Sequence, residues 1–439
     1  MSGRGSAVIS AISDYRRRLS SALKNDVVRI WRAGAVHIGF SQWVNHAIYI
    51  AQRVLLSRIL GTEGIGHIAV VSTTLQLIRL PAGGGVFTAL TKLMAESNRD
   101  IERERVVMGT ALYINLATAV LTSAFAWLVL LHTHWVPDRV ANRILRLMVP
   151  FLPVVILSES FRCALMGQRR MRAAGLAITI SAFLSMAIVI LWAWFAGLSG
   201  WSLAQIATFF IVLACVAYPM RAVISVRWDG RVARRLLHIG VFAFLAQLAG
   251  QLVLHFDTLA VSGLLKDTEA TAIYNTASLV AQQLIIVPGA ILAVAFPMVA
   301  QNRHNMSKLR SLYVEISKKL AWLTVVVSVA APLLVYPLFR LMGDKFILSL
   351  PPFLVLLLGF VARSLYILDN TYLDALGRTD LTFVSGLIAM GTTIVLNLLM
   401  IPRGGVMGAA WATTLAMYIS LLLRRAMVYL FIFRWQALR

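Results

Sequence analysis

The chain has 439 residues, of which 59% are hydrophobic and only 13% are charged, and its mean hydropathy is +0.79. These values exclude a water-soluble domain and indicate an integral membrane protein. The formal net charge of +23 would suggest nucleic acid as a partner of a soluble chain. In a membrane protein it favours anionic lipid headgroups instead, and no nucleic-acid partner is expected.

The chain begins with a polar, basic segment, residues 1–32, that carries Arg16, Arg17 and Arg18. Its apolar side chains recur at helical spacing, which predicts an amphipathic helix lying on the cytoplasmic membrane surface. A basic tail without any membrane contact is the alternative. The segment is too polar for a secretory signal.

Twelve apolar stretches follow, each long enough to cross the hydrocarbon core, which takes about 20 residues. They cover residues 35–57, 65–91, 107–132, 142–167, 173–197, 201–220, 236–262, 271–298, 314–338, 347–373, 380–401 and 405–430. The sequence therefore predicts an all-α membrane protein of about 12 transmembrane helices. The stretches around Cys163 and Cys215 are apolar, so neither a disulfide nor a metal site is expected, and no cofactor motif is present.

The loop charges predict the orientation of these helices. If the N-terminus is cytoplasmic, most of the 41 lysines and arginines fall in cytoplasmic segments. This distribution follows the positive-inside rule and places both termini in the cytoplasm.

The two halves of the chain resemble each other weakly, at an offset of about 206–210 residues. Pro81 corresponds to Pro288, and Met166-Gly167-Gln168 corresponds to Leu376-Gly377-Arg378. Six stretches in each half predict parallel repeats, related by an axis along the membrane normal. We expect a first bundle over 33–222, a basic cytoplasmic linker over 223–235 and a second bundle over 236–439 with a short basic tail.

Several ordered segments resemble the Wzx-type polysaccharide flippases of the multidrug/oligosaccharidyl-lipid/polysaccharide exporter superfamily. These segments are Leu56 to Gly66, Phe242 to Val261, Ala272 to Ala277, Phe296-Pro297, Leu376 to Arg378 and Gly404 to Thr413. The resemblance covers nearly the whole chain from about residue 35. It implies two six-helix bundles around a central cavity, and alternating access to an oligosaccharide on a polyprenyl diphosphate carrier. It also implies a bacterial inner membrane, surface polysaccharide (O-antigen or exopolysaccharide) assembly and possible assembly-protein partners.

Arginines inside the apolar stretches are the leading site candidates, because a guanidinium near the bilayer centre costs at least about 2.5–3.5 kcal/mol unless it faces protein, water or an anion. Arg79 precedes a proline and three glycines that would loosen its helix. Arg363 has no acidic residue one helical turn away, and Arg53 lies in a similar apolar setting. We expect all three to line a cavity that receives a diphosphate. Backbone carbonyls freed at Pro81 could instead satisfy Arg79, and Arg53 could reach the membrane surface.

Uncharged polar residues give the first helix of each half a polar character. They are Gln42, Asn45, His46 and Gln52 in the first half, with Gln247 and Gln251 in the second. They could line a cavity that accepts sugars, or form hydrogen bonds between helices.

Acidic residues are candidates for coupling or gating with H+ or Na+. Asp257 lies where the flippase resemblance implies an acid, and Glu159 corresponds to Asp369 at the repeat offset. Glu159 and Arg162, three residues apart, could also simply pair with each other.

No catalytic set accompanies these residues, and the loops are too short for a catalytic domain, so we do not expect an enzyme. The main alternative function is an ion-coupled exporter of cationic drugs from the same superfamily. A membrane glycosyltransferase or polysaccharide polymerase is a distant one.

Overall fold

The computed structural model describes residues 35–97, 100–133, 136–285 and 305–430, together with 289, 291, 292, 295, 299 and 302. The predicted amphipathic segment 1–32, Pro288, Phe296-Pro297 and the end of the C-terminal tail lie outside these described residues. Within them the chain forms helices and no strand, which confirms the all-α prediction.

The first half contains helices α2 (Ala35–Ile78), α3 (Gly84–Glu96), α4 (Ile101–His132), α5 (Arg139–Met148), α6 (Leu152–Gly167) and α7 (Met171–Ala217). The second contains α8 (Gly230–Leu265), α9 (Thr268–Gln283), α11 (Met306–Met342), α12 (Leu350–Ala375) and α13 (Thr379–Tyr429). Short 3-10 turns cover Val149–Phe151, Tyr218–Met220 and Asp344–Ser349.

Three of these helices each contain two membrane spans. Eight helical segments of the described residues are long and apolar enough to cross a membrane. The 44 residues of α2 would extend about 66 Å at 1.5 Å per residue, about twice the thickness of the hydrocarbon core. The backbone leaves helical geometry at Gly61 in α2, Gly197 in α7 and Gly405 in α13, each with a positive φ near 60°. Glycine adopts this conformation without steric cost, so each of these helices reverses there.

Backbone turns recur at matching positions in the two halves. Positive φ angles occur at Gly61 and Lys266, at Arg169 and Gly377, and at Gly197 and Gly405, at offsets of 205 to 208 residues. This agreement supports the predicted internal repeat. The bounds of the two bundles stay a prediction.

One boundary differs from the sequence prediction. Helix α8 begins at Gly230 rather than at 236, because the Asp229 side chain accepts hydrogen bonds from the backbone N–H groups of Arg231 and Val232. Part of the predicted linker is therefore helical. Arg227 pairs with Glu102 and Arg235 pairs with Glu96, so the linker is held against the first half.

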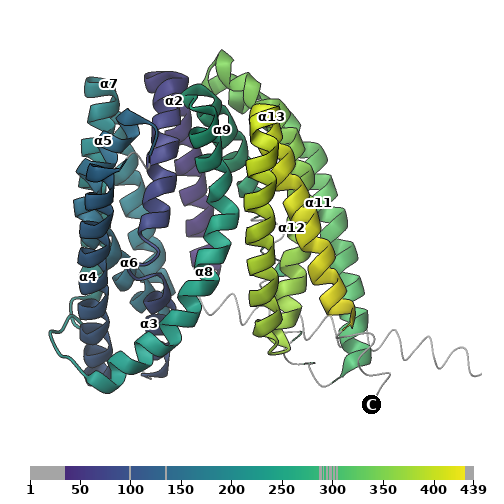
Figure 1. Cartoon of the computed structure of the whole chain (residues 1–439). Coiled ribbons are helices and arrows are strands. Elements are labelled where there is room, and N and C mark those ends of the chain that lie inside the picture. Colours follow the sequence, from purple (N-terminus) through teal and green to yellow (C-terminus); the bar gives the residue numbers. More distant parts are fainter. Residues whose placement is uncertain are drawn as a thin grey trace, which may run out of the picture.

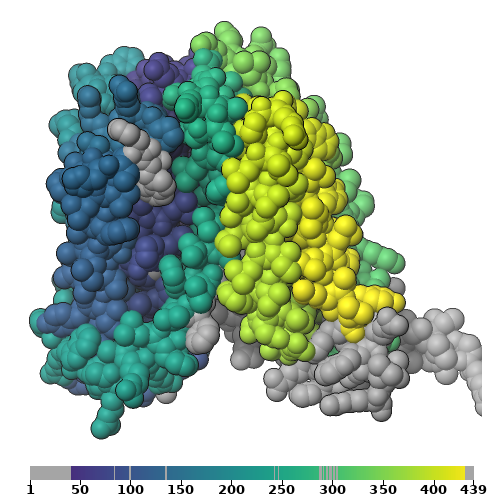
Figure 2. All heavy atoms as spheres, viewed as in Figure 1, coloured from purple at the N-terminus to yellow at the C-terminus, as the bar shows by residue number. Residues whose placement is uncertain are grey.

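Most helices form two groups that meet at the top of Figure 1 and separate towards the bottom, whereas the first part of α8 crosses towards the first half and packs against α3. We call the end at the top of the figure the Gly61 end, because α2, α7 and α13 reverse there, and the opposite end the Asp100 end. In Figure 2 the atoms of α9 and α13 are in contact near the top, whereas α8 and α13 separate towards the bottom. Gly66 lies so close to α9 that an added Cβ would be 2.1 Å from the Thr268 carbonyl oxygen. The two groups are therefore packed tightly at the Gly61 end.

Candidate functional site

Arg79 lies at a break in the second membrane span, as the proline and glycines after it predict. Helix α2 ends at Ile78, a turn follows over 79–83, and α3 begins at Gly84. The Thr118 hydroxyl donates a 2.9 Å hydrogen bond to the Ala82 carbonyl, so a neighbouring helix satisfies a backbone group freed at the turn. The Arg79 side chain is exposed rather than enclosed by its own turn.

The first cavity of the site lies among α2, α6 and α7 and has a volume of about 450 Å³. We call it the first-half cavity. Its polar lining residues include Gln52, Arg53, Gln76, Arg79, Ser158, Glu159 and Gln205. Glu159 forms the expected pair with Arg162, whose Nε lies 2.9 Å from the carboxylate. The acid in this cavity is thus neutralised by a neighbour, and Arg53 and Arg79 leave the lining net positive.

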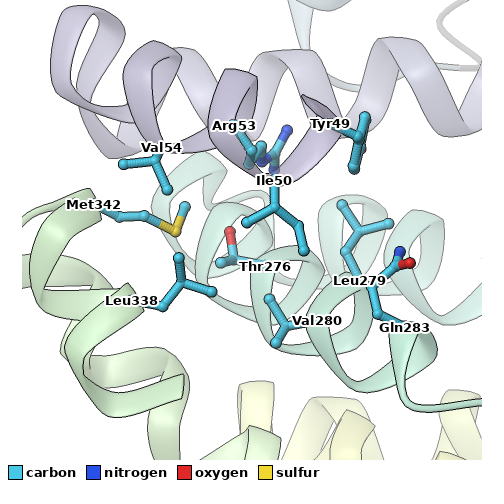
Figure 3. Close-up of a pocket in the computed structure, with 10 residues that line it drawn as sticks. All are labelled: Tyr49, Ile50, Arg53, Val54, Thr276, Leu279, Val280, Gln283, Leu338 and Met342. Carbon is cyan, nitrogen blue, oxygen red and sulfur yellow. The ribbon is translucent and has the colours of Figure 1, made fainter. Parts of the chain in front are cut away.

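Arg53 joins the first-half cavity to the other half of the chain. Its side chain is 9% exposed, and one guanidinium nitrogen donates a 2.9 Å hydrogen bond to the side-chain oxygen of Asn275 on α9. Its Nε is buried without a partner. Figure 3 shows Arg53 on α2 beside a small, mainly apolar pocket that Thr276 of α9 and Met342 of α11 also line.

Two further contacts close the Gly61 end. The Ser57 hydroxyl donates to the Met342 carbonyl at 3.1 Å, and Arg58 Nε donates to the Leu341 carbonyl at 2.5 Å. Both acceptors lie at the C-terminal end of α11, where carbonyl groups lack helical partners and carry partial negative charge. Residues of α2 therefore cap a helix of the other half.

The second cavity lies among α8, α12 and α13 and has a volume of about 540 Å³. We call it the second-half cavity. Arg363 and Arg424 line it, together with Gln247, Gln251, Tyr366, Asn370, Asp374, Thr379 and Thr382. The Nε and Nη1 atoms of both arginines are buried without hydrogen-bond partners.

Arg79 of the first-half cavity and Arg363 of the second-half cavity both lie within electrostatic range of His255 on α8. Their role as ligands for an anion stays a prediction.

Asp257 is 1% exposed and is surrounded by hydroxyl groups. The Tyr274 hydroxyl donates to it at 2.5 Å, the Thr413 hydroxyl lies at 3.4 Å, and the Thr258 N–H donates at 2.7 Å. Within the described residues no ion pair reaches this carboxyl group. A buried acid with three donors and no cationic side chain suits a proton or a small cation.

Asp369 has a different setting. It is fully buried, accepts a 2.5 Å hydrogen bond from the Tyr313 hydroxyl and pairs with Arg425 Nε at 3.2 Å. Although Asp369 and Glu159 correspond in sequence, each is neutralised by an arginine at a different position, Arg425 on α13 and Arg162 on α6. Their roles in coupling or gating stay predictions.

The other predicted site residues lie nearer the start of α2. Gln42 is exposed, Asn45 and His46 are half-buried, and the lining of the two cavities does not include them. Their role in the cavity stays a prediction.

Sequence reasoning missed Arg424 and Arg425, which it counted with the basic C-terminal tail. In the structure Arg424 is 5% exposed and lies on α13, which continues to Tyr429. The signal was present, because Leu421-Leu422-Leu423 precede the pair and Ala426-Met427-Val428 follow it. Two arginines inside a continuous apolar stretch belong to the span.

Solved structures of membrane transporters share this fold. A multidrug resistance MATE family transporter of the MOP superfamily in an inward-facing conformation matches with a TM-score of 0.74 and 13% identity, over 88% of this chain and 94% of that one. The lipid II flippase MurJ, in an inward closed conformation, matches with a TM-score of 0.71 and 16% identity, over 90% and 87%. A MOP superfamily transporter from Pyrococcus furiosus, described as having a binding pocket of reverse polarity, matches with a TM-score of 0.65 and 13% identity, over 91% and 95%.

The chain therefore has the same fold as these transporters and this flippase. At the level of sequence, the model of a family described as polysaccharide biosynthesis protein matches residues 31–303, more than half of the chain. The chain belongs to this family. No curated protein matches its sequence.

Proposed function

We propose that this chain moves an oligosaccharide on a polyprenyl diphosphate carrier from the inner to the outer leaflet of a bacterial inner membrane, for surface polysaccharide assembly. The observation that carries the proposal is the pair of cavities, each of which is lined by two arginines. A diphosphate matches several guanidinium groups well, because each planar guanidinium can donate two parallel hydrogen bonds to phosphate oxygens. Amide and hydroxyl side chains in the same cavities suit sugar hydroxyls.

The transport mechanism in this proposal is alternating access. The basic loops place the Asp100 end in the cytoplasm together with both termini. The contacts of Arg53, Ser57 and Arg58 then close the outer, Gly61 end, and the helices diverge towards the cytoplasm, where a lipid-linked headgroup would enter. Rocking of the two repeats about the central region would break these contacts and open the outer end.

Energy for a directed cycle would come from an ion gradient, with Asp257 as the proton or Na+ site. Its burial among hydroxyl donors without a basic partner supports this assignment. Glu159 and Asp369 are weaker candidates, because arginine partners already neutralise them.

An ion-coupled exporter of cationic compounds is the second candidate, favoured by the similarity to MATE transporters. Such a substrate needs acids that are free inside the cavity. The acid of the first-half cavity is paired with Arg162, and the second-half cavity holds two arginines beside one acid, Asp374. Each lining therefore has more arginines than acids, which supports an anionic substrate instead.

Deletion of the gene tests the proposal in cells. We expect loss of a surface glycan and accumulation of its lipid-linked precursor on the cytoplasmic side. Normal surface glycans together with new sensitivity to cationic dyes would favour the drug exporter.

A further inference from the structure

Arg424 is a buried arginine of α13 that lines the second-half cavity. The side chain is 5% exposed, and its Nε and Nη1 atoms have no hydrogen-bond partner. Desolvating a guanidinium without pairing it is costly, so an unpaired group of this kind calls for an explanation. The nearby carboxylate of Asp369 accepts its hydrogen bonds from Arg425 and Tyr313.

Two rings hold the arginines of the second-half cavity in place. The Arg424 guanidinium lies 4.5 Å from the centroid of the Tyr366 ring, and the Arg363 guanidinium lies 5.3 Å from that of Phe360. Stacking fixes each guanidinium while leaving its N–H groups available for an anion. Arg363 likewise keeps two buried, unpartnered nitrogens.

The remaining lining suits a polyhydroxyl compound. Gln251, Asn370 and Thr382 provide amide and hydroxyl groups, and Asp374 is a carboxylate that can accept hydrogen bonds from sugar hydroxyls. The volume of about 540 Å³ lies in the range of small-molecule sites, roughly 300–1,000 Å³.

The position of the cavity along the helices gives it a place in the transport cycle. Asp374 and Thr379 flank the turn at Gly377, so the second-half cavity reaches towards the Asp100 end. The first-half cavity is lined by Tyr49, which lies in α2 ahead of the Gly61 turn, and by Trp201, just after Gly197, so it reaches towards the Gly61 end. The second-half cavity therefore lies nearer the Asp100 end than the first-half cavity does.

We propose that the second-half cavity is a distinct binding site for a sugar phosphate headgroup, in which Arg424 and Arg363 bind phosphate and the amide, hydroxyl and carboxylate groups bind the sugar. It is the site that a lipid-linked saccharide occupies first when it enters from the Asp100 end. This inference rests on the proposed function and adds to it a second site and a new residue, Arg424.

Binding measurements on the full-length protein in phosphatidylcholine nanodiscs test the site. The probe is farnesyl diphosphate carrying one N-acetylglucosamine, titrated by calorimetry. We expect Arg424→Gln to weaken binding about tenfold or more, because a charge-assisted hydrogen bond is lost. Arg424→Lys should weaken probe binding less, because the positive charge remains although the paired N–H groups of the guanidinium are lost. Arg403→Gln, an exposed arginine on the same helix, should leave it unchanged.

A second arm separates the lipid-linked saccharide from ordinary phospholipid. Phosphatidylglycerol also offers a phosphate beside hydroxyl groups, and competition with the probe at equal affinity would overturn the assignment. If Arg424→Gln fails to fold, photo-crosslinking of the wild-type protein with a benzophenone derivative of the probe locates the binding site. Crosslinks to α12 and α13 support the site, and crosslinks confined to α2, α6 and α7 contradict it.

The outcome also separates this inference from the proposed function. If Arg79→Gln abolishes probe transport while Arg424→Gln binds the probe as the wild type does, the second site is wrong and the function stands. If the wild type does not bind the probe at all, the proposed function fails as well.

Discussion

The Arg53 guanidinium on α2 donates a 2.9 Å hydrogen bond to Asn275 on α9, and the same arginine lines the first-half cavity. One side chain thus contacts both the candidate substrate cavity and the opposite half of the chain. An anion in the cavity would compete with Asn275 for Arg53. Substrate binding would then weaken a contact that keeps the Gly61 end closed.

Substitution of Asn275 tests this relationship. Asn275→Ala should favour opening of the Gly61 end by about tenfold, because a buried hydrogen bond to a charged group is worth about 1.5–3 kcal/mol. Asn275→Asp should have the opposite effect and slow transport, since an ion pair would replace the neutral acceptor. The measurement is disulfide formation between Ser57→Cys and Met342→Cys, positions joined by a 3.1 Å hydrogen bond. Equal crosslinking in both variants would show that Arg53 does not hold this end closed.

Arg79 should contribute to transport through its charge and its fork geometry. Arg79→Lys should retain part of the activity, about a tenth, because an ammonium attracts phosphate as a point charge. Arg79→Gln should lose nearly all of it. Arg403→Gln serves as the exposed control. Full activity of Arg79→Gln in a transport assay with a lipid-linked diphosphate would show that Arg79 is not part of the substrate site.

Asp257 should determine ion dependence rather than substrate affinity. Asp257→Asn preserves the shape of the group and one acceptor oxygen for Tyr274, but it removes the titratable charge. We expect transport by the variant to become independent of pH and Na+ gradients, with probe binding unchanged. Tyr274→Phe, which keeps the carboxyl group, should remain ion-dependent. Gradient-driven transport by Asp257→Asn would place the coupling site elsewhere.

Asp138, in the loop before α5, should stabilise the fold in a pH-dependent way. Burial alone would raise the pKa of Asp138, but the hydrogen bond with His67 and those from the backbone N–H groups of Ala141 and Val140 hold it below its ordinary value. A carboxyl group with a lowered pKa stabilises the folded state above its unfolded pKa, about 3.9, and this contribution is lost as the pH falls through the folded pKa.

Thermal unfolding of Asp138→Asn measures this effect. The amide oxygen can still cap α5, so the main loss in the variant is the carboxylate oxygen that faces His67 Nδ1. We expect it to unfold at a lower temperature than the wild type at neutral pH, and the difference to shrink as the pH falls below about 4. A difference that stays constant down to that pH would rule out the charge of Asp138 as the cause.

Much of the fold could be predicted from the sequence, because membrane spans depend on local composition. The broken helix after Arg79 follows from a proline and three glycines, and the turns at Gly61, Gly197, Gly377 and Gly405 follow from glycines in the printed sequence. The start of α8 was placed six residues late, since a hydropathy criterion excludes the basic first turn that Asp229 caps.

The site was harder to predict, because the partners of its polar residues come from distant segments. The pair Glu159 and Arg162 is local and could be predicted from its spacing. The contacts of Arg53 with Asn275 and of Asp369 with Arg425 join helices that are far apart in sequence. No periodicity indicates such pairs. Arg424 was missed for another reason, because it was counted with the basic tail although apolar residues flank it on both sides.

Transport of a fluorescent polyprenyl-diphosphate-linked saccharide in proteoliposomes is the most direct test of the central claim. We predict that the wild-type chain moves this lipid between leaflets and that the double variant Arg79→Gln with Arg363→Gln does not, although both proteins fold and insert equally. Transport of cationic dyes with no movement of the lipid-linked saccharide, or full activity of the double variant, would contradict it.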